Sequence, residues 1–135
     1  MKKFLTRWIP VLIWMGVIFY LSSVPNLKSN FAPELDLVLR KIAHVLEYTI
    51  LTALFWRATR EEFIHLSIKK ILIYSFCFSF LYALSDEFHQ LFITGRQGSL
   101  RDVAIDSIGI LIALLAINKK SRQNDNSIAK YKKLQ

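Results

Sequence analysis

The chain has 135 residues, a net charge of +8 and a mean hydropathy of +0.34, and 53% of its residues are hydrophobic. This length suits one domain, and the gathering of the apolar residues into long runs favours a membrane protein over a soluble core. The basic residues lie at the ends of these runs and between them, which fits a charge bias across a membrane and disfavours nucleic acid as a partner. The single Cys77 excludes a disulfide framework and a cysteine metal site.

The first apolar segment, residues 8–24, carries aromatic anchors for the membrane interfaces at Trp8, Trp14 and Tyr20. A bilayer is spanned by about 20 mainly apolar residues, so this segment predicts a transmembrane helix. Its basic start also fits a secretory signal, but the exit YLSSVPN is a weak cleavage site. We therefore expect a retained helix.

Three further segments, residues 36–56, 71–93 and 103–117, also predict transmembrane helices. The second of the four predicted helices is marginal, because its charged side chains need neighbouring helices to shelter them. No stretch alternates with period two, which excludes a transmembrane barrel. We expect an all-α membrane protein with four transmembrane helices in residues 1–118. A basic, flexible cytoplasmic tail, residues 119–135, would follow and contact anionic lipid head groups.

Lysine and arginine are distributed unevenly between the two sides of the four predicted helices. Thirteen fall on the side that holds both termini and the 57–70 loop, and five fall on the other side. Positive charge marks the cytoplasmic side, so both termini are expected to be cytoplasmic. The 25–40 and 94–101 loops are expected to face outward.

This orientation places polar groups together at the outer ends of three predicted helices. They are Lys41, His44, Glu47 and Tyr48 on the second helix, Asp86, Glu87, His89 and Gln90 on the third, and Asp102 and Asp106 on the fourth. Small residues at Gly109, Ala113 and Ala116 continue the face of Asp106, so this face is expected to pack closely inside the bundle. Because intramembrane ionisable groups usually face the interior or a water-filled cavity, the pattern predicts an outward-facing polar pocket.

Simpler interpretations compete for several of these residues. Ser99 followed by Asp102 forms a capping-box pattern, so Asp102 is interpreted first as a helix start. Lys41 alternatively snorkels toward the surface, and His44 and Glu47 alternatively form a structural contact between helices. The residues that packing explains least well are Asp86, Glu87 and His89.

The polar residues also follow a family pattern. The segments RKIAHVLEYTILTALFWR (40–57) and DEFHQLFITGRQGSLRDVAIDSIG (86–109) resemble the VanZ-like family of bacterial membrane proteins. The matching positions are Lys41, His44, Glu47, Tyr48, Asp86, Glu87, His89, Gln90, Phe92, Arg96, Asp102, Val103, Asp106 and Gly109. The resemblance implies a multi-pass protein of the bacterial cell membrane, associated with resistance to glycopeptide antibiotics of the teicoplanin type. It implies no particular reaction.

A first hypothesis is that the pocket binds or modifies a lipid-linked envelope precursor or a lipoglycopeptide, with membrane lipids as further partners. Guanidinium groups suit phosphate and carboxylate, and acids and histidines suit sugars and amines. The binding candidates are Lys41, His44, Glu47, Tyr48, Asp86, Gln90, Arg96, Arg101 and Asp102.

A second hypothesis is a membrane hydrolase or transferase that uses acid–base chemistry. Its catalytic candidates are Glu87, His89 and Asp106. A divalent metal cofactor would polarise a water, with candidate ligands His44, Glu47, Glu87, His89 and Asp106. Proton-coupled transport and a purely structural set of charges are further alternatives, and the oligomeric state stays open.

Overall fold

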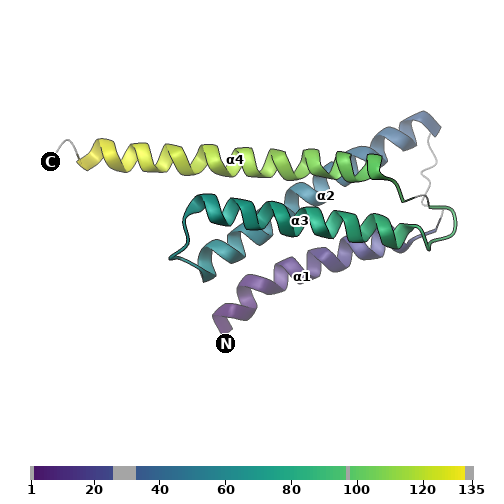
Figure 1. Ribbon diagram of the computed structural model, residues 1–135, viewed down its shortest axis with the longest axis horizontal. Coiled ribbons are helices and arrows are strands. Elements are labelled where there is room, and N and C mark those ends of the chain that lie inside the picture. The colour runs from purple at the N-terminus through teal and green to yellow at the C-terminus, as the bar shows by residue number, and fades with distance from the viewer. Residues whose placement is uncertain (1, 26–32, 97, 133–135) are drawn as a thin grey trace.

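The protein, described here by a computed structural model, is a bundle of four helices (Figure 1). The structure describes residues 2–25, 33–96 and 98–132. The helices are α1 (Lys2–Ser23), α2 (Pro33–Glu62), α3 (Ile68–Gln90) and α4 (Leu100–Lys132). No strand occurs among these residues, so the prediction of an all-α protein with four helices is confirmed.

Two of the four helices are long and apolar enough to cross a membrane. These are α1, over Phe4–Ser23 with a mean hydropathy of 1.7, and α3, over Ile68–Gln90 with 1.4. Such helices occur in soluble cores and signal sequences too, so length and composition alone suggest rather than establish a membrane protein. Four spans and cytoplasmic termini stay predictions.

α2 is longer than the segment predicted from hydrophobicity and ends at Glu62. Its last turn contacts α1, where the Arg7 guanidinium lies 2.8 Å from the Glu62 carboxylate and 3.4 Å from that of Glu61. This ion-paired end lies on the side of the bundle opposite the polar residues, and joins α1 to α2 there.

α4 continues to Lys132, through the segment predicted to be a flexible tail. Residues 119–132 of this segment are helical, and residues 133–135 lie outside the described part of the chain. The flexibility and the cytoplasmic location of the tail stay predictions. The sequence contains no glycine or proline after Gly109, so no residue breaks the helix once the apolar segment ends. Hydrophobicity marked the end of the apolar run, which is not the end of the helix.

α2 packs against each of the other three helices. Tyr48 and Leu51 of α2 are fully buried in the core. On α4, Asp106 and Gly109 are buried as predicted, whereas Ala116 is exposed. The predicted face of α4 is therefore buried near the start of the helix and exposed by Ala116.

The backbones of α2 and α4 approach each other closely at Gly109. A Cβ at this position would collide with the Val45 carbonyl oxygen. The Thr49 hydroxyl donates to the carbonyl oxygens of Val45, at 2.7 Å, and Gly109, at 3.0 Å. The absence of a side chain thus lets the two backbones come together, as small residues do in membrane helix pairs.

We expect Gly109→Ala to destabilise the protein by about 1–3 kcal/mol, because the added methyl group meets backbone that has no rotamer to adjust. Gly16→Ala on α1 is the matched control, since nothing lies within 4 Å of its added Cβ. That change should be neutral or stabilising, by about 0.5–1 kcal/mol. Thermal unfolding of both purified variants in the same detergent measures the difference, and equal midpoints would contradict this account of the contact.

Candidate functional site

The predicted site residues gather at one end of the bundle. The C-terminal ends of α1 and α3 and the N-terminal ends of α2 and α4 meet there, on the right in Figure 1. Residues 26–32 of the predicted 25–40 outer loop lie outside the described part of the chain. The α3–α4 connection is described except for residue 97, and it borders the site.

His44 of α2 and Asp106 of α4 form the central contact. The distance between His44 Nδ1 and Asp106 Oδ1 is 3.0 Å. Asp106 is fully buried, and its second oxygen, Oδ2, has no hydrogen-bond partner among the described residues. A buried carboxylate oxygen without a partner is costly, so this atom is a point at which the site can accept a further group.

Glu87 connects the end of α3 to the start of α4. Its Oε2 accepts a hydrogen bond from the Ser99 backbone N–H at 2.8 Å. Ser99 is the N-cap, as predicted, and its hydroxyl accepts from the Arg101 N–H at 3.1 Å. The second half of the predicted capping box is corrected, because the Ser99 N–H donates to Glu87 rather than Asp102. Asp102 remains in the first turn of α4, where a negative charge is favourable.

Asp86 and Gln90 lie beside Glu87 and are both buried. The Gln90 amide nitrogen lies 3.2 Å from Asp86 Oδ2 and 3.5 Å from Glu87 Oε1. The amide group of Gln90 thus donates to two buried carboxylates. The predicted polar face at the end of α3 is therefore present, and it faces the interior.

His89 points in another direction and contacts α1. Its Nε2 lies 3.0 Å from the Ser23 hydroxyl oxygen, and its ring stacks on Phe19 with centroids 4.5 Å apart. Residues two apart on a helix do not face each other, so Glu87 and His89 diverge. The structure brings Glu87 together with His44 and Asp106 instead: one ligand atom from each lies within 4.8 Å of the others. Of the five metal candidates, Glu47 and His89 fall outside this group.

Arg96, in the α3–α4 connection, attaches this loop to α1. Its Nη2 donates to the Leu21 carbonyl oxygen at 2.7 Å, and its Nε donates to that of Val24 at 3.2 Å. The last carbonyls of a helix have no partner within the helix, and Arg96 supplies one. Burial, followed by the nearby Arg40 charge, lowers the pKa of Arg96, which still leaves an arginine protonated at neutral pH.

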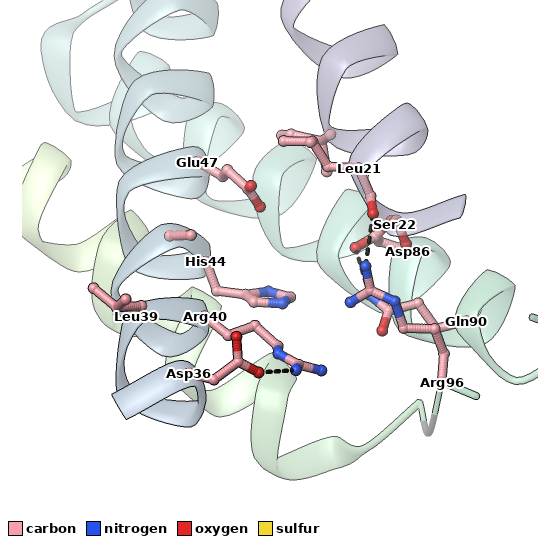
Figure 2. Close-up of a pocket in the computed structure, with 12 residues that line it drawn as sticks. Leu21, Ser22, Asp36, Leu39, Arg40, His44, Glu47, Asp86, Gln90 and Arg96 are labelled. Carbon is pink, nitrogen blue, oxygen red and sulfur yellow. Dashed lines mark hydrogen bonds and ion pairs between the residues drawn. The ribbon is translucent and has the colours of Figure 1, made fainter. Parts of the chain in front are cut away.

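Two adjoining cavities open among these residues. The first, about 350 Å³, has an apolar wall from α1 and α2, including Ile18 and Leu39. In Figure 2, His44 and Glu47 project from α2 toward Asp86 and Arg96 on the far side of this cavity. The second, about 560 Å³, shares Arg40, His44, Gln90 and Arg96 with the first. The first cavity therefore adds apolar residues and carboxylates to this shared lining, whereas the second adds Lys41 and Arg101 together with Asp102.

Several residues of the site were not predicted. Ser23 and Trp14 of α1 contact it: Trp14 Nε1 donates to the Glu47 carbonyl oxygen at 2.9 Å. Arg40 and Asp36 form an i, i+4 ion pair of 2.7 Å at its edge. The i, i+4 spacing of Asp36 and Arg40 could have indicated their ion pair. No local sequence pattern in α1 indicated that Trp14 and Ser23 would contact the site. Tyr48, a predicted binding residue, is fully buried in the core and lines neither cavity.

The VanZ/LLP1 family model matches residues 7–119 of the chain. The match spans most of α1, all of α2 and α3, and α4 as far as Lys119, and so includes every residue of the site. No curated protein and no solved structure shows a significant match. The resemblance drawn from the polar motifs is confirmed by the family match.

We expect Arg96→Lys to loosen the α3–α4 connection, because an ammonium group is a point donor and cannot reproduce the guanidinium fork across two carbonyls. A hydrogen bond from a charged group contributes about 1.5–3 kcal/mol, so the melting temperature should fall by several degrees. Arg101→Lys, at an exposed position in the first turn of α4, is the control and should leave stability unchanged. Thermal unfolding and limited proteolysis of the connection measure both variants; equal behaviour would show that the Arg96 fork contributes little.

Proposed function

The chain belongs to the VanZ/LLP1 family, and from this we propose that its polar pocket binds or modifies a lipid-linked component of the bacterial cell envelope. Family membership suggests a membrane protein linked to glycopeptide resistance. The pocket would face outward, as the distribution of lysine and arginine predicts. An antibiotic with a lipid tail would meet the same components there.

The observation that supports this proposal is the pairing of two cavities with different linings. The first offers apolar contact along Ile18, Leu21 and Leu39, which suits part of a hydrocarbon chain. The second offers Lys41 and Arg101, which suit phosphate. Arg96 borders both. A molecule with an apolar chain joined to an anionic head group carries both chemistries, and a free polar metabolite carries only one.

The role in resistance would follow from this binding. A protein that shields or alters a lipid-linked surface component changes what an antibiotic can reach. The acids at the depth of the first cavity, Glu47 and Asp86, would then accept hydrogen bonds from sugar or amine groups of the bound molecule. This division assigns the phosphate to the basic residues and the remainder of the head group to the acids.

We expect the protein in nanodiscs to bind a polyprenyl phosphate more tightly than the matching polyprenol. Lys41→Ala and Arg101→Ala should each weaken phosphate binding about five-fold, because one basic residue near an anionic head group contributes about 1 kcal/mol. Lys69→Ala, exposed at the start of α3 and distant from the pocket, is the matched control. Fluorescence titration with a labelled lipid provides the measurement.

Two results would count against the proposal: equal binding of the phosphate and the alcohol, or equal loss in the Lys69 variant. Teicoplanin susceptibility of cells that carry the same variants at matched membrane levels then tests the link to resistance. The pocket variants, and not Lys69→Ala, should alter it.

A hydrolase or transferase acting on the bound lipid is a second candidate, favoured by the 3.0 Å contact between His44 and Asp106. A carboxylate that holds an imidazole in one orientation is the usual partner of a histidine general base. In this version His44 is the general base, whereas His89, one of the three catalytic candidates from the sequence, contacts α1.

For this second candidate, His44→Asn should abolish turnover of a lipid-linked phosphate while leaving its binding within about three-fold, because a general base contributes about 10²–10⁴-fold in rate. His65→Ala, which removes an exposed imidazole in the connection between α2 and α3, should leave turnover unchanged. Mass spectrometry of the released product compares turnover in the two variants. Turnover that persists in His44→Asn would exclude His44 as the base.

A further inference from the structure

Three buried carboxylates lie at this end of the bundle, and Asp86 alone of the three lines a cavity. Asp86 and Glu87 are each 5% exposed, and Asp106 is fully buried. Among the described residues, no lysine or arginine forms an ion pair with any of the three, and His44 is the one ion-pair partner, at Asp106. Buried carboxylates need a compensating charge, which a bound cation supplies.

Side chains from three helices, α2, α3 and α4, converge at this place. His44, Glu87 and Asp106 each offer one ligand atom, and these atoms lie within 4.8 Å of one another. Ligands at about 2.0–2.2 Å from a tetrahedral metal stand about 3.4 Å apart, so the 3.0 Å between His44 Nδ1 and Asp106 Oδ1 is close to the spacing of neighbouring ligands. Glu87 would complete the set after a shift of about 1 Å.

A second observation also points to a ligand at this place. Asp106 Oδ2 is buried and has no hydrogen-bond partner among the described residues. Glu87, by contrast, is oriented by the Ser99 N–H at 2.8 Å, with the Gln90 amide at 3.5 Å from its other oxygen. Metal-binding carboxylates are commonly held by such outer contacts. One carboxylate is thus positioned, and the other has an unused acceptor.

We propose that His44, Glu87 and Asp106 together bind one divalent first-row transition-metal ion, such as Zn²⁺ or Mn²⁺. One imidazole with two carboxylates suits this class, whereas Mg²⁺ and Ca²⁺ prefer oxygen ligands alone. The metal would replace the proton shared by His44 Nδ1 and Asp106, so binding releases a proton. This inference deepens the proposed function and rests on it for a role, since three protein ligands leave a position open for a phosphate oxygen or a water.

The test uses the full chain without an affinity tag, purified in detergent, stripped with a chelator and dialysed. Calorimetric titration with ZnCl₂ and MnCl₂, checked by elemental analysis, should give about one equivalent of at least one metal. Glu87→Gln and Asp106→Asn keep the shape of the side chains and should each weaken binding at least ten-fold. His44→Ala should do the same.

Two controls remove the same chemical groups elsewhere. His65→Ala removes an exposed imidazole and Glu61→Gln an exposed carboxylate, and both should bind metal as the wild type does. Circular dichroism checks folding, and if Asp106→Asn does not fold, Glu87→Gln decides. A wild type that binds neither metal, or pocket variants within two-fold of it, would overturn the inference. Polyprenyl phosphate binding is measured separately. Lipid binding without metal binding would contradict only the metal site, whereas metal binding without lipid binding would contradict only the proposed lipid ligand.

Discussion

The close contact between α2 and α4 around Gly109 sets the relative position of His44 and Asp106, the central pair of the site. Val45 meets the backbone of Gly109, and His44 is the residue before it. Asp106 lies three residues before Gly109, almost one helical turn, so the same contact places it opposite His44. A side chain at residue 109 would separate these two groups. Asp106 would then be a buried charge without its partner, a change that costs about 3–5 kcal/mol.

The buried acids are accommodated by three different means. Asp106 contacts His44, Glu87 accepts from the Ser99 N–H, and Asp86 is reached by the Gln90 amide. Two of these partners are neutral, so no lysine or arginine of the described residues is paired with these three carboxylates. The opposite half of the bundle is closed by aromatic packing, with Phe55 stacked on Phe78 at 4.0 Å. The polar residues of the site therefore occupy one end of the bundle, and aromatic side chains fill the other.

The sequence was most informative where chemistry repeats with helical spacing. The face through Asp106 and Gly109 was predicted from helical periodicity, because intramembrane polar groups and small residues turn inward. Helix ends were predicted less well: α4 continues because no breaker follows Gly109. The partners of His89 and Arg96 were not predictable, since both lie on α1 and depend on how α1 packs, which no local pattern records. The division of the polar residues between the His44 group and the α1 contacts followed only from the tertiary structure.

The attachment of Arg96 to α1 has a consequence for recognition. A free arginine side chain loses about 2 kcal/mol of rotamer entropy when a ligand immobilises it. Arg96 has already lost this freedom, because two of its five donor N–H groups are held by the Leu21 and Val24 carbonyls. Its remaining donors are therefore preorganised, and an anion that reaches them binds without ordering the side chain. The same rigidity narrows the choice of ligand, since a head group of the wrong length cannot draw the guanidinium toward it.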